Sequence, residues 1–103
     1  MPHKKRDDAV AERFGANLRK LRAEADMTQE ELALRAEVHR TQISLMEGAD
    51  RLPRLDTAIK LAGALGATVG ELTAEIVWTP SEHLPGGLVV GGRTGHADAA
   101  EEA

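Results

Sequence analysis

Apolar residues in the first two thirds of the chain recur three or four positions apart, the spacing at which side chains share one face of a helix. One such stripe predicts a helix that Asp8 caps and that ends near Glu24. This stripe consists of Val10, Phe14, Leu18 and Leu21. A later stripe from Leu55 to Leu65 predicts another helix. It ends at Gly66, a residue suited to the left-handed conformation that follows many helices.

Two short motifs mark further helix starts. Thr28 and Glu31 have the spacing of a capping box, in which each side chain accepts a hydrogen bond from the backbone of the other residue. Thr68 and Glu71 repeat this spacing and predict a short fifth helix. The sequence therefore predicts helices that begin just after Thr28 and just after Thr68.

The helix that begins at Gln29 is short, because a new apolar pattern starts at Val38. It should span about eight residues, followed by a turn of about three and a helix of about nine that closes at Gly48. Two short helices joined by a tight turn form a helix-turn-helix, here over residues 28–47. Since helices this short are unstable alone, we expect an all-α, compact five-helix domain.

The rest of the chain has a different character. Residues 76–79 and 88–90 are brief β-prone runs separated by prolines and glycines. We expect the end of the chain, rich in Gly, Ala and acidic residues, to be disordered. The predicted organisation is a basic arm at 1–7, a helix-turn-helix DNA-binding domain at 8–75, a β-prone tail at 76–91 and an acidic end at 92–103.

Charge is unevenly distributed, although the formal net charge is −4. Residues 1–66 hold 12 Lys or Arg and 11 Asp or Glu, whereas residues 67–103 hold one Arg and six acidic residues. The acidity therefore lies near the end of the chain, and the overall charge does not exclude an anionic partner.

Composition excludes several classes of protein. A chain of 103 residues suits one domain, and the lack of cysteine excludes disulfides, thiolate zinc sites and cysteine nucleophiles. The four histidines have no metal-ligand spacing, and no catalytic or phosphate-loop pattern occurs, so we expect no metal, no cofactor and no enzyme. No apolar run approaches the roughly 20 residues that span a bilayer, and no secretory signal is present. We therefore expect a cytoplasmic protein with no membrane partner.

The helix-turn-helix carries a more specific pattern than its layout alone. Its residues are Thr28-Gln29-Glu30-Glu31-Leu32-Ala33, Val38, Ile43-Ser44 and Glu47, followed by Pro53, Leu55-Asp56-Thr57, Ala64-Leu65-Gly66 and Glu71-Leu72. With these residues the chain resembles the phage repressor/Cro-type (XRE-like) helix-turn-helix family. The resemblance covers most of the predicted domain and implies a lambda-repressor-like fold and DNA binding.

The second helix of the motif is the predicted recognition helix. Because Val38, Ile43 and Met46 should face the core, the residues on the outward side of this helix should face the major groove of DNA. Arg40 is the leading candidate, since a guanidinium can bond both O6 and N7 of guanine. The predicted DNA-contacting residues here are His39, Arg40, Thr41, Ser44 and Leu45.

Other residues are predicted to contact phosphates or to support the motif. Gln29 lies in the first turn of its helix, where free backbone N–H groups attract phosphate, and the resemblance implies that it also braces the recognition helix. The resemblance further implies a structural salt bridge between Arg22 and Glu47. Further candidates for phosphate or arm contacts are Thr28, Lys4, Lys5, Arg6 and Arg51.

Four positions depart from the family pattern, one of them Leu45, where similar proteins often have a polar or basic residue. The chain has Glu37 and Ala49 where similar proteins have glycine, and His39 where they have a Ser or Thr helix cap. A residue other than glycine in a left-handed turn costs on the order of 1 kcal/mol. We therefore expect a small cost in stability at these positions and no change of fold.

These observations favour a sequence-specific regulator of transcription that binds double-stranded DNA, a repressor that acts as a homodimer on a palindromic operator. A narrower alternative is an antitoxin, with a toxin as its protein partner, or a restriction-system controller that regulates its own operon. A second alternative, favoured by the acidic tail, is a protein-interaction module built on the same fold.

The tail is the predicted dimerisation element. Short strands that stand alone leave their edges unpaired, and pairing across a two-fold axis would satisfy these edges. In the alternative, the strands fold back onto their own fifth helix, and the dimer forms through that helix or only on DNA. The predicted dimer contacts are Ile76, Trp78, Leu88 and Val90.

Overall fold

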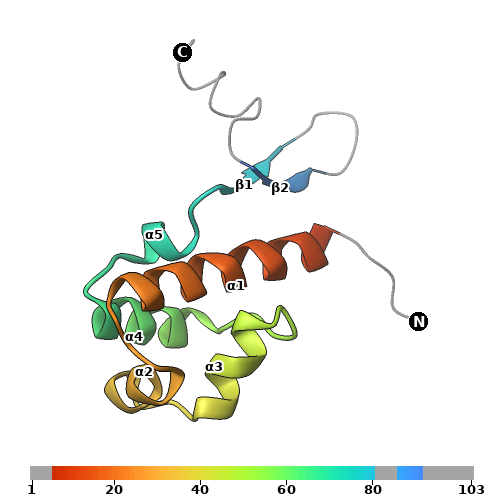
Figure 1. Ribbon diagram of the computed structural model, residues 1–103. Coiled ribbons are helices and arrows are strands. Elements are labelled where there is room, and N and C mark those ends of the chain that lie inside the picture. Colours follow the sequence, from red (N-terminus) through yellow and green to blue (C-terminus); the bar gives the residue numbers. More distant parts are fainter. Residues whose placement is uncertain (1–5, 81–85, 92–103) are drawn as a thin grey trace.

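The computed structural model describes residues 6–80 and 86–91, in which five helices precede a two-stranded hairpin (Figure 1). This confirms the predicted five-helix domain with a short β tail. The elements are α1 (Arg6–Glu24), α2 (Gln29–Ala36), α3 (Arg40–Glu47), α4 (Leu55–Leu65), α5 (Val69–Leu72), β1 (Ile76–Thr79) and β2 (Gly87–Val90).

Both predicted capping boxes are present. The Thr28 hydroxyl accepts a hydrogen bond from the N–H of Glu31 at 3.0 Å, and the Glu31 carboxylate accepts one from the N–H of Thr28 at 2.8 Å. Thr68 and Glu71 form the same pair of bonds at 3.0 and 2.9 Å. Side chains thus satisfy backbone donors that would otherwise be free at the starts of α2 and α5.

The start of α1 differs from the prediction. The helix begins at Arg6, so Asp8 lies in its first turn and does not cap it, and Arg6 belongs to the helix and not to the arm. A carboxylate in the first turn still faces the positive end of the helix dipole. Asp8 can therefore favour the helix from inside it, which lets α1 extend further toward the N-terminus.

Helix α1 crosses the middle of the molecule, with α2, α3 and α4 on one side and α5 and the hairpin on the other (Figure 1). Apolar side chains from every helix meet in one core, which stabilises helices that are too short to persist alone. The largest fully buried side chains are Leu18, Leu32, Ile43, Met46, Leu61 and Leu72.

A buried polar side chain joins α1 to the end of α5. The Asn17 amide nitrogen donates hydrogen bonds to the carbonyl of Leu72 at 2.9 Å and to that of Ala74 at 3.0 Å. Since Asn17 is only 9% exposed, both amide hydrogens depend on these carbonyls for partners. The bonds fix where the chain leaves α5 and turns into β1.

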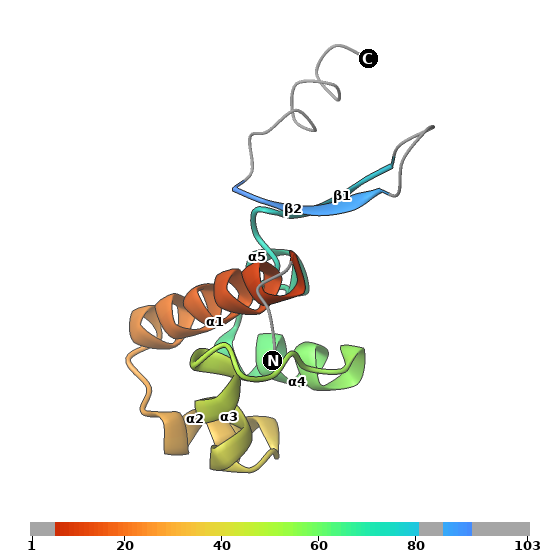
Figure 2. The same cartoon turned by 90° about the vertical axis from the view of Figure 1, so that its right-hand side faces the viewer.

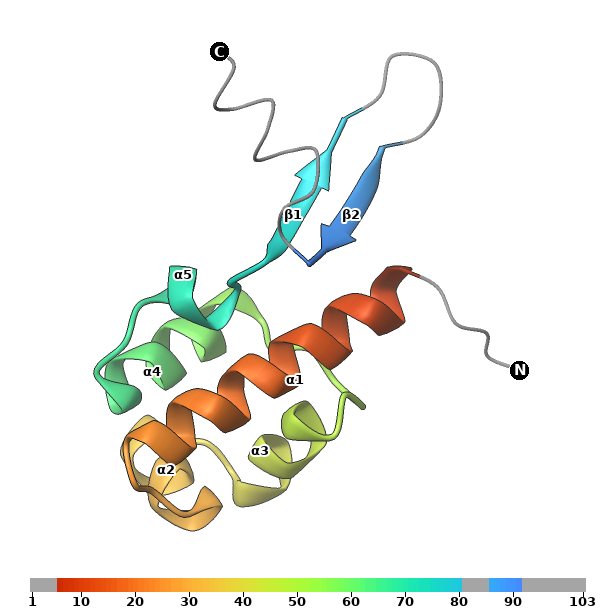
Figure 3. The ribbon, with the colours of Figure 1, turned by 45° about the horizontal axis from the view of Figure 1, so that its top comes forward.

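The two strands pair with each other within one chain, whereas the sequence analysis expected them to pair across a two-fold axis. They are antiparallel, with Ile76 opposite Val90 and Trp78 opposite Leu88. The hairpin folds back against α1 and not against α5 (Figure 3). Ile76 packs on the core, and Leu88 and Val90 are half-buried, whereas Trp78 remains 54% exposed.

Gly15 marks the closest approach of α1 to α3. A Cβ at this position would lie 2.5 Å from the carbonyl oxygen of Met46 and 3.0 Å from that of Glu47. Both atoms belong to the backbone, so the two helices would have to separate. We expect Gly15→Ala to lower the free energy of unfolding by about 1–3 kcal/mol, measured by urea denaturation.

Gly63 in α4 provides a matched control, because no atom lies within 4 Å of the position of its missing Cβ. Gly63→Ala should raise the free energy of unfolding by up to about 1 kcal/mol, the helix propensity difference between the two residues. If Gly15→Ala were as stable as the wild type, the close crossing of α1 and α3 would be wrong.

Candidate nucleic-acid interface

Helix α3 lies on the side of the molecule away from the hairpin (Figure 1), and several of its polar side chains are exposed. Ile43 and Met46 are buried in the core. The side chains predicted to face DNA lie on the opposite side of the helix. Leu45 is half-buried, and the exposed members are His39, Arg40, Thr41 and Ser44.

The turns on either side of α3 contain two of the residues that depart from the family pattern. Glu37 takes the left-handed conformation with φ 59°, and the N–H of Val38 donates to the Ala33 carbonyl at 3.0 Å. Ala49 takes φ 66° after α3, where the N–H of Asp50 donates to the Leu45 carbonyl at 2.8 Å. The backbone hydrogen bonds that close a helix at a residue in the left-handed conformation therefore form even though neither residue is glycine.

His39 occupies the cap position of α3, but its side chain makes no capping hydrogen bond. Helix α3 is therefore a short helix without a side-chain cap, and it depends on contacts to its neighbours for its position.

Glu47 at the end of α3 makes the main polar contact between this helix and its neighbours α1 and α2. Its carboxylate accepts hydrogen bonds from Arg22 Nε at 2.6 Å and Arg22 Nη2 at 3.0 Å, and from the Gln29 amide at 3.0 Å. A second arginine of α1, Arg19, donates to the Glu47 carbonyl oxygen at 2.8 Å. The structure thus brings Arg22, Glu47 and Gln29 together and ties α1, α2 and α3 to one carboxylate.

The environment of Glu47 keeps the carboxylate charged. Burial alone would raise the pKa of Glu47, but hydrogen bonds from Arg22 and Gln29 outweigh burial, and the pKa lies below its ordinary value. The hydrogen bond between Arg22 and Glu47 also raises the pKa of Arg22. The side chain of Glu47 is only 5% exposed, so this carboxylate requires its cationic partner.

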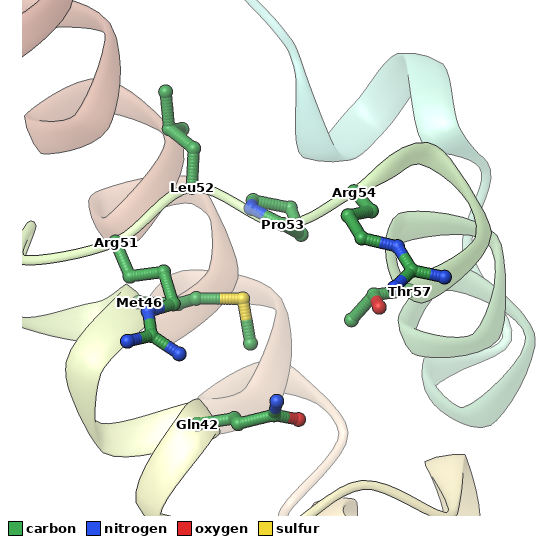
Figure 4. A pocket seen from close by; sticks show the side chains of 7 residues that line it. All are labelled: Gln42, Met46, Arg51, Leu52, Pro53, Arg54 and Thr57. Carbon is green, nitrogen blue, oxygen red and sulfur yellow. The ribbon is translucent and has the colours of Figure 1, made fainter.

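A cleft of about 290 Å³ lies beside α3, between this helix and the start of α4 (Figure 4). Arg51 and Arg54 border it from either side of Pro53, and both are exposed. The guanidinium of Arg54 donates to the Asp56 carboxylate at 2.8 and 3.2 Å, which lowers the pKa of Asp56. The side chains that line the cleft are Gln42, Met46, Arg51, Leu52, Pro53, Arg54 and Thr57.

Arg51 was a predicted phosphate contact, whereas Arg54 and Gln42, which line the same cleft, were not among the predicted site residues. The sequence contained one indication, since Arg51 and Arg54 lie in the four residues directly before a predicted helix start, where backbone N–H groups are free. Gln42 could not be assigned, because it lies half-buried at the border between the polar and buried sides of α3.

Thr28 is not among the residues that line this cleft. Thr28 is exposed, with its hydroxyl engaged in the cap of α2, and Arg6 is the first residue of α1. Lys4 and Lys5 lie outside the described residues. Within residues 6–80 and 86–91, no group of three His, Asp or Glu side chains is placed to hold a metal ion. None of the helices described is long and apolar enough to cross a membrane.

Residues 18–72, from the middle of α1 to the end of α5, match the helix-turn-helix family HTH_3. The chain belongs to this family. The predicted XRE-like resemblance is therefore confirmed, and α2 and α3 are its helix-turn-helix. HTH_3 proteins are DNA-binding regulators and not enzymes, and this chain is a regulator of that kind. The hairpin lies outside the matched residues.

Restriction-system proteins are among the relatives of this HTH_3 chain. Control protein C.MunI of Mycoplasma sp is 38% identical over 65 residues, 62% of this chain and 88% of the relative. Control protein C.BamHI of Bacillus amyloliquefaciens is 38% identical over 60 residues, 57% of this chain and 74% of the relative. A similar solved structure is the restriction-modification controller protein C.AhdI of Aeromonas hydrophila. Its TM-score is 0.61 and its identity 34%, over 62% of this chain and 97% of that one.

The contact between Glu47 and Arg22 predicts a pH dependence of stability. Because the pKa of Glu47 is lowered in the folded protein, its stabilising effect is complete above the ordinary carboxyl pKa of about 4.3 and is lost as the pH falls through the lower, folded pKa. Glu47→Gln should lower the free energy of unfolding by about 3 kcal/mol at pH 7, since it leaves Arg22 without its counter-charge. Urea denaturation at pH 7, 5 and 3 should show that the difference in unfolding free energy between wild type and Glu47→Gln becomes smaller as the pH falls.

Glu24→Gln is the matched control, because Glu24 forms an exposed ion pair with Lys20 at 3.9 Å. Its effect at pH 7 should stay within about 0.5 kcal/mol. Equal losses of stability in the two variants, or a loss for Glu47→Gln that does not change with pH, would contradict the proposed role of the buried carboxylate.

Proposed function

We propose that this chain is a sequence-specific regulator of the restriction-controller type, a repressor that binds a palindromic operator in double-stranded DNA as a homodimer. The observation that carries the proposal is the exposed polar face of α3, held by a buried ion pair to α1. Its likeness to the control proteins C.MunI and C.BamHI supports the choice of the controller class over an antitoxin.

The base contacts come from α3. A helix fits the major groove of B-DNA, and Arg40 at the exposed start of α3 can bond both acceptors of a guanine. Thr41 and Ser44 are exposed along the same helix and can bond bases or phosphates. His39 contacts the same groove from the helix cap, and Leu45 contributes an apolar contact, such as one to a thymine methyl group.

Phosphate contacts flank the base contacts on two sides. Arg51 and Arg54 lie beside the cleft next to α3, where they can bind the phosphates of the strand that borders the groove. Gln29 and Thr28 lie at the start of α2 and bind phosphate from the other side. For Gln29, the hydrogen bond to Glu47 leaves the second amide hydrogen for a phosphate oxygen.

Two copies of the chain are needed for a specific site. Helix α3 has only eight residues and can contact a few base pairs. A two-fold dimer doubles this number and matches a palindromic sequence. DNA selected from a random pool by the full chain should therefore contain two inverted half-sites.

Substitution of Arg40 tests the readout. Arg40→Ala should weaken binding to the selected site by about 1–3 kcal/mol and relax the preference at one base position of each half-site. Arg51→Ala is the matched control, since it removes the same charge from a phosphate contact. It should weaken binding to all sequences similarly and reduce the slope of log K against log salt by about one per bound copy.

Binding is measured by fluorescence anisotropy on the selected site, on single-base variants and at several salt concentrations. An unchanged base preference in Arg40→Ala would contradict the assignment of α3 as the recognition helix. A wild-type chain that binds no DNA would instead favour a protein-interaction module.

The basic arm is a further proposed contact. Lys4, Lys5 and Arg6 lie before or at the start of α1, and a basic arm can reach phosphates or the minor groove. In the variant Lys4→Ala/Lys5→Ala, the salt slope should fall by about two per bound copy while the base preference stays the same. A slope equal to that of the wild type would remove the arm from the proposed interface.

A further inference from the structure

One guanidinium at the border of the cleft beside α3, which we call the arginine cleft, is already paired with an anion of the chain itself. The Nε and Nη2 atoms of Arg54 donate hydrogen bonds to the two carboxylate oxygens of Asp56, at 3.2 and 2.8 Å. Arginine binds the phosphates of DNA through two parallel bonds of the same kind. Asp56 therefore occupies on Arg54 the position that a phosphate of DNA would take.

The same carboxylate also uses a backbone donor of α4. Asp56 lies in the first turn of this helix, and its Oδ1 atom accepts a hydrogen bond from the N–H of Thr57 at 2.9 Å. The first N–H groups of a helix have no partner inside the helix and attract anions. Hydrogen bonds from Arg54 keep the pKa of Asp56 low, so the carboxylate is charged at neutral pH. Asp56 thus takes up both a cation and a helix N–H group next to the arginine cleft.

The ion pair also determines where the charged end of Arg54 lies. In Figure 4, the Arg54 side chain extends away from Arg51 and toward Thr57. Asp56 is not among the residues that line the arginine cleft. Its carboxylate therefore holds the guanidinium of Arg54 toward α4 and away from the other arginine of the cleft.

The loop before Arg54 is packed, whereas the Arg54 side chain is 83% exposed. Leu52 and Pro53 line a second, apolar cavity of about 310 Å³ beside α4, together with Val10 and Phe14 of α1. Figure 2 shows the loop between α3 and α4 passing below α1. Proline further restricts the backbone directly before Arg54. A change of partner by Arg54 therefore needs a new side-chain rotamer and no movement of the loop.

We infer that Asp56 is a positioning residue of the DNA interface, and that it competes with the DNA backbone for Arg54. In the free protein, Asp56 holds the guanidinium on α4. In the complex, a phosphate replaces the carboxylate, and the guanidinium turns toward the arginine cleft. The inference rests on the proposed function, in which Arg54 binds phosphate. Because ion pairs between exposed side chains are weak, the exchange is reversible and removes only part of the affinity that Arg54 provides.

Substitution of Asp56 in the full chain tests the exchange. Asp56→Asn should tighten binding to every DNA sequence, by roughly two- to fivefold per bound copy, the range expected for an exposed ion pair that no longer has to be broken. The base preference should stay the same, because phosphate contacts carry no sequence information. Fluorescence anisotropy on the selected site and on its single-base variants measures both quantities, and circular dichroism shows that the fold is retained.

Asp50→Asn is the matched control, because it removes the same charge from an exposed position in the loop between α3 and α4. It should change the dissociation constant less than Asp56→Asn does. Equal effects of the two substitutions, or an Asp56→Asn variant that binds no tighter than wild type, would overturn the inference while the proposed function stands. If the wild-type chain binds no DNA, the proposed function fails and the inference fails with it.

A double-mutant cycle separates release of Arg54 from a general effect of charge. In a chain that already carries Arg54→Ala, no guanidinium remains to be released. Adding Asp56→Asn to this chain should change the dissociation constant no more than Asp50→Asn does. An effect of Asp56→Asn that has the same size with and without Arg54 would show that the carboxylate acts through its charge alone, which contradicts the exchange.

Nuclear magnetic resonance of the arginine Nε–H groups shows the exchange directly. The Arg54 signal is identified by its loss in Arg54→Lys. Its position should differ between wild type and Asp56→Asn in the free proteins, because only wild type has the carboxylate partner. In the DNA complexes the two positions should coincide, since Arg54 then binds a phosphate in both proteins. A difference that persists in the complexes means that Asp56 keeps Arg54 on DNA, and this result overturns the inference.

Discussion

Helix α3 keeps its position because a buried carboxylate at its end is bound from two other helices. Glu47 accepts hydrogen bonds from Arg22 in α1 and Gln29 in α2, at the place where Gly15 lets the backbones of α1 and α3 approach. A charge this deeply buried is costly unless it is paired and hydrogen-bonded. Alternative placements of α3 that separate the partners are therefore disfavoured. Helix α3 needs this anchor, since it has eight residues and no side-chain cap.

Local features of the sequence were sufficient to predict most of the fold. The boxes at Thr28 and Thr68 fixed the starts of α2 and α5, because a cap involves residues only three positions apart. The apolar stripes identified the buried side of α1 and α4 for the same local reason. The start of α1 was less well defined, because an aspartate stabilises a helix both at the cap and in the first turn.

Long-range contacts could not be predicted in this way. Asn17 lies among apolar positions, but its partners, the carbonyls of Leu72 and Ala74, are more than fifty residues away. The arginine cleft and the cavity beside α4 exist only where separate helices meet, and no local pattern records a shape formed by several elements. The strands at 76–79 and 88–90 were recognised, but their pairing and their packing on α1 depend on tertiary structure.

Leu52 and Pro53 form a wall between two spaces, since both residues line the arginine cleft beside α3 and also the apolar cavity beside α4. Figure 4 shows Leu52 pointing to the opposite side of this loop from Arg51. Proline restricts the backbone here, so a shift of the wall on one side moves the other side with it. A group that displaces this wall from one space therefore changes the volume of the other.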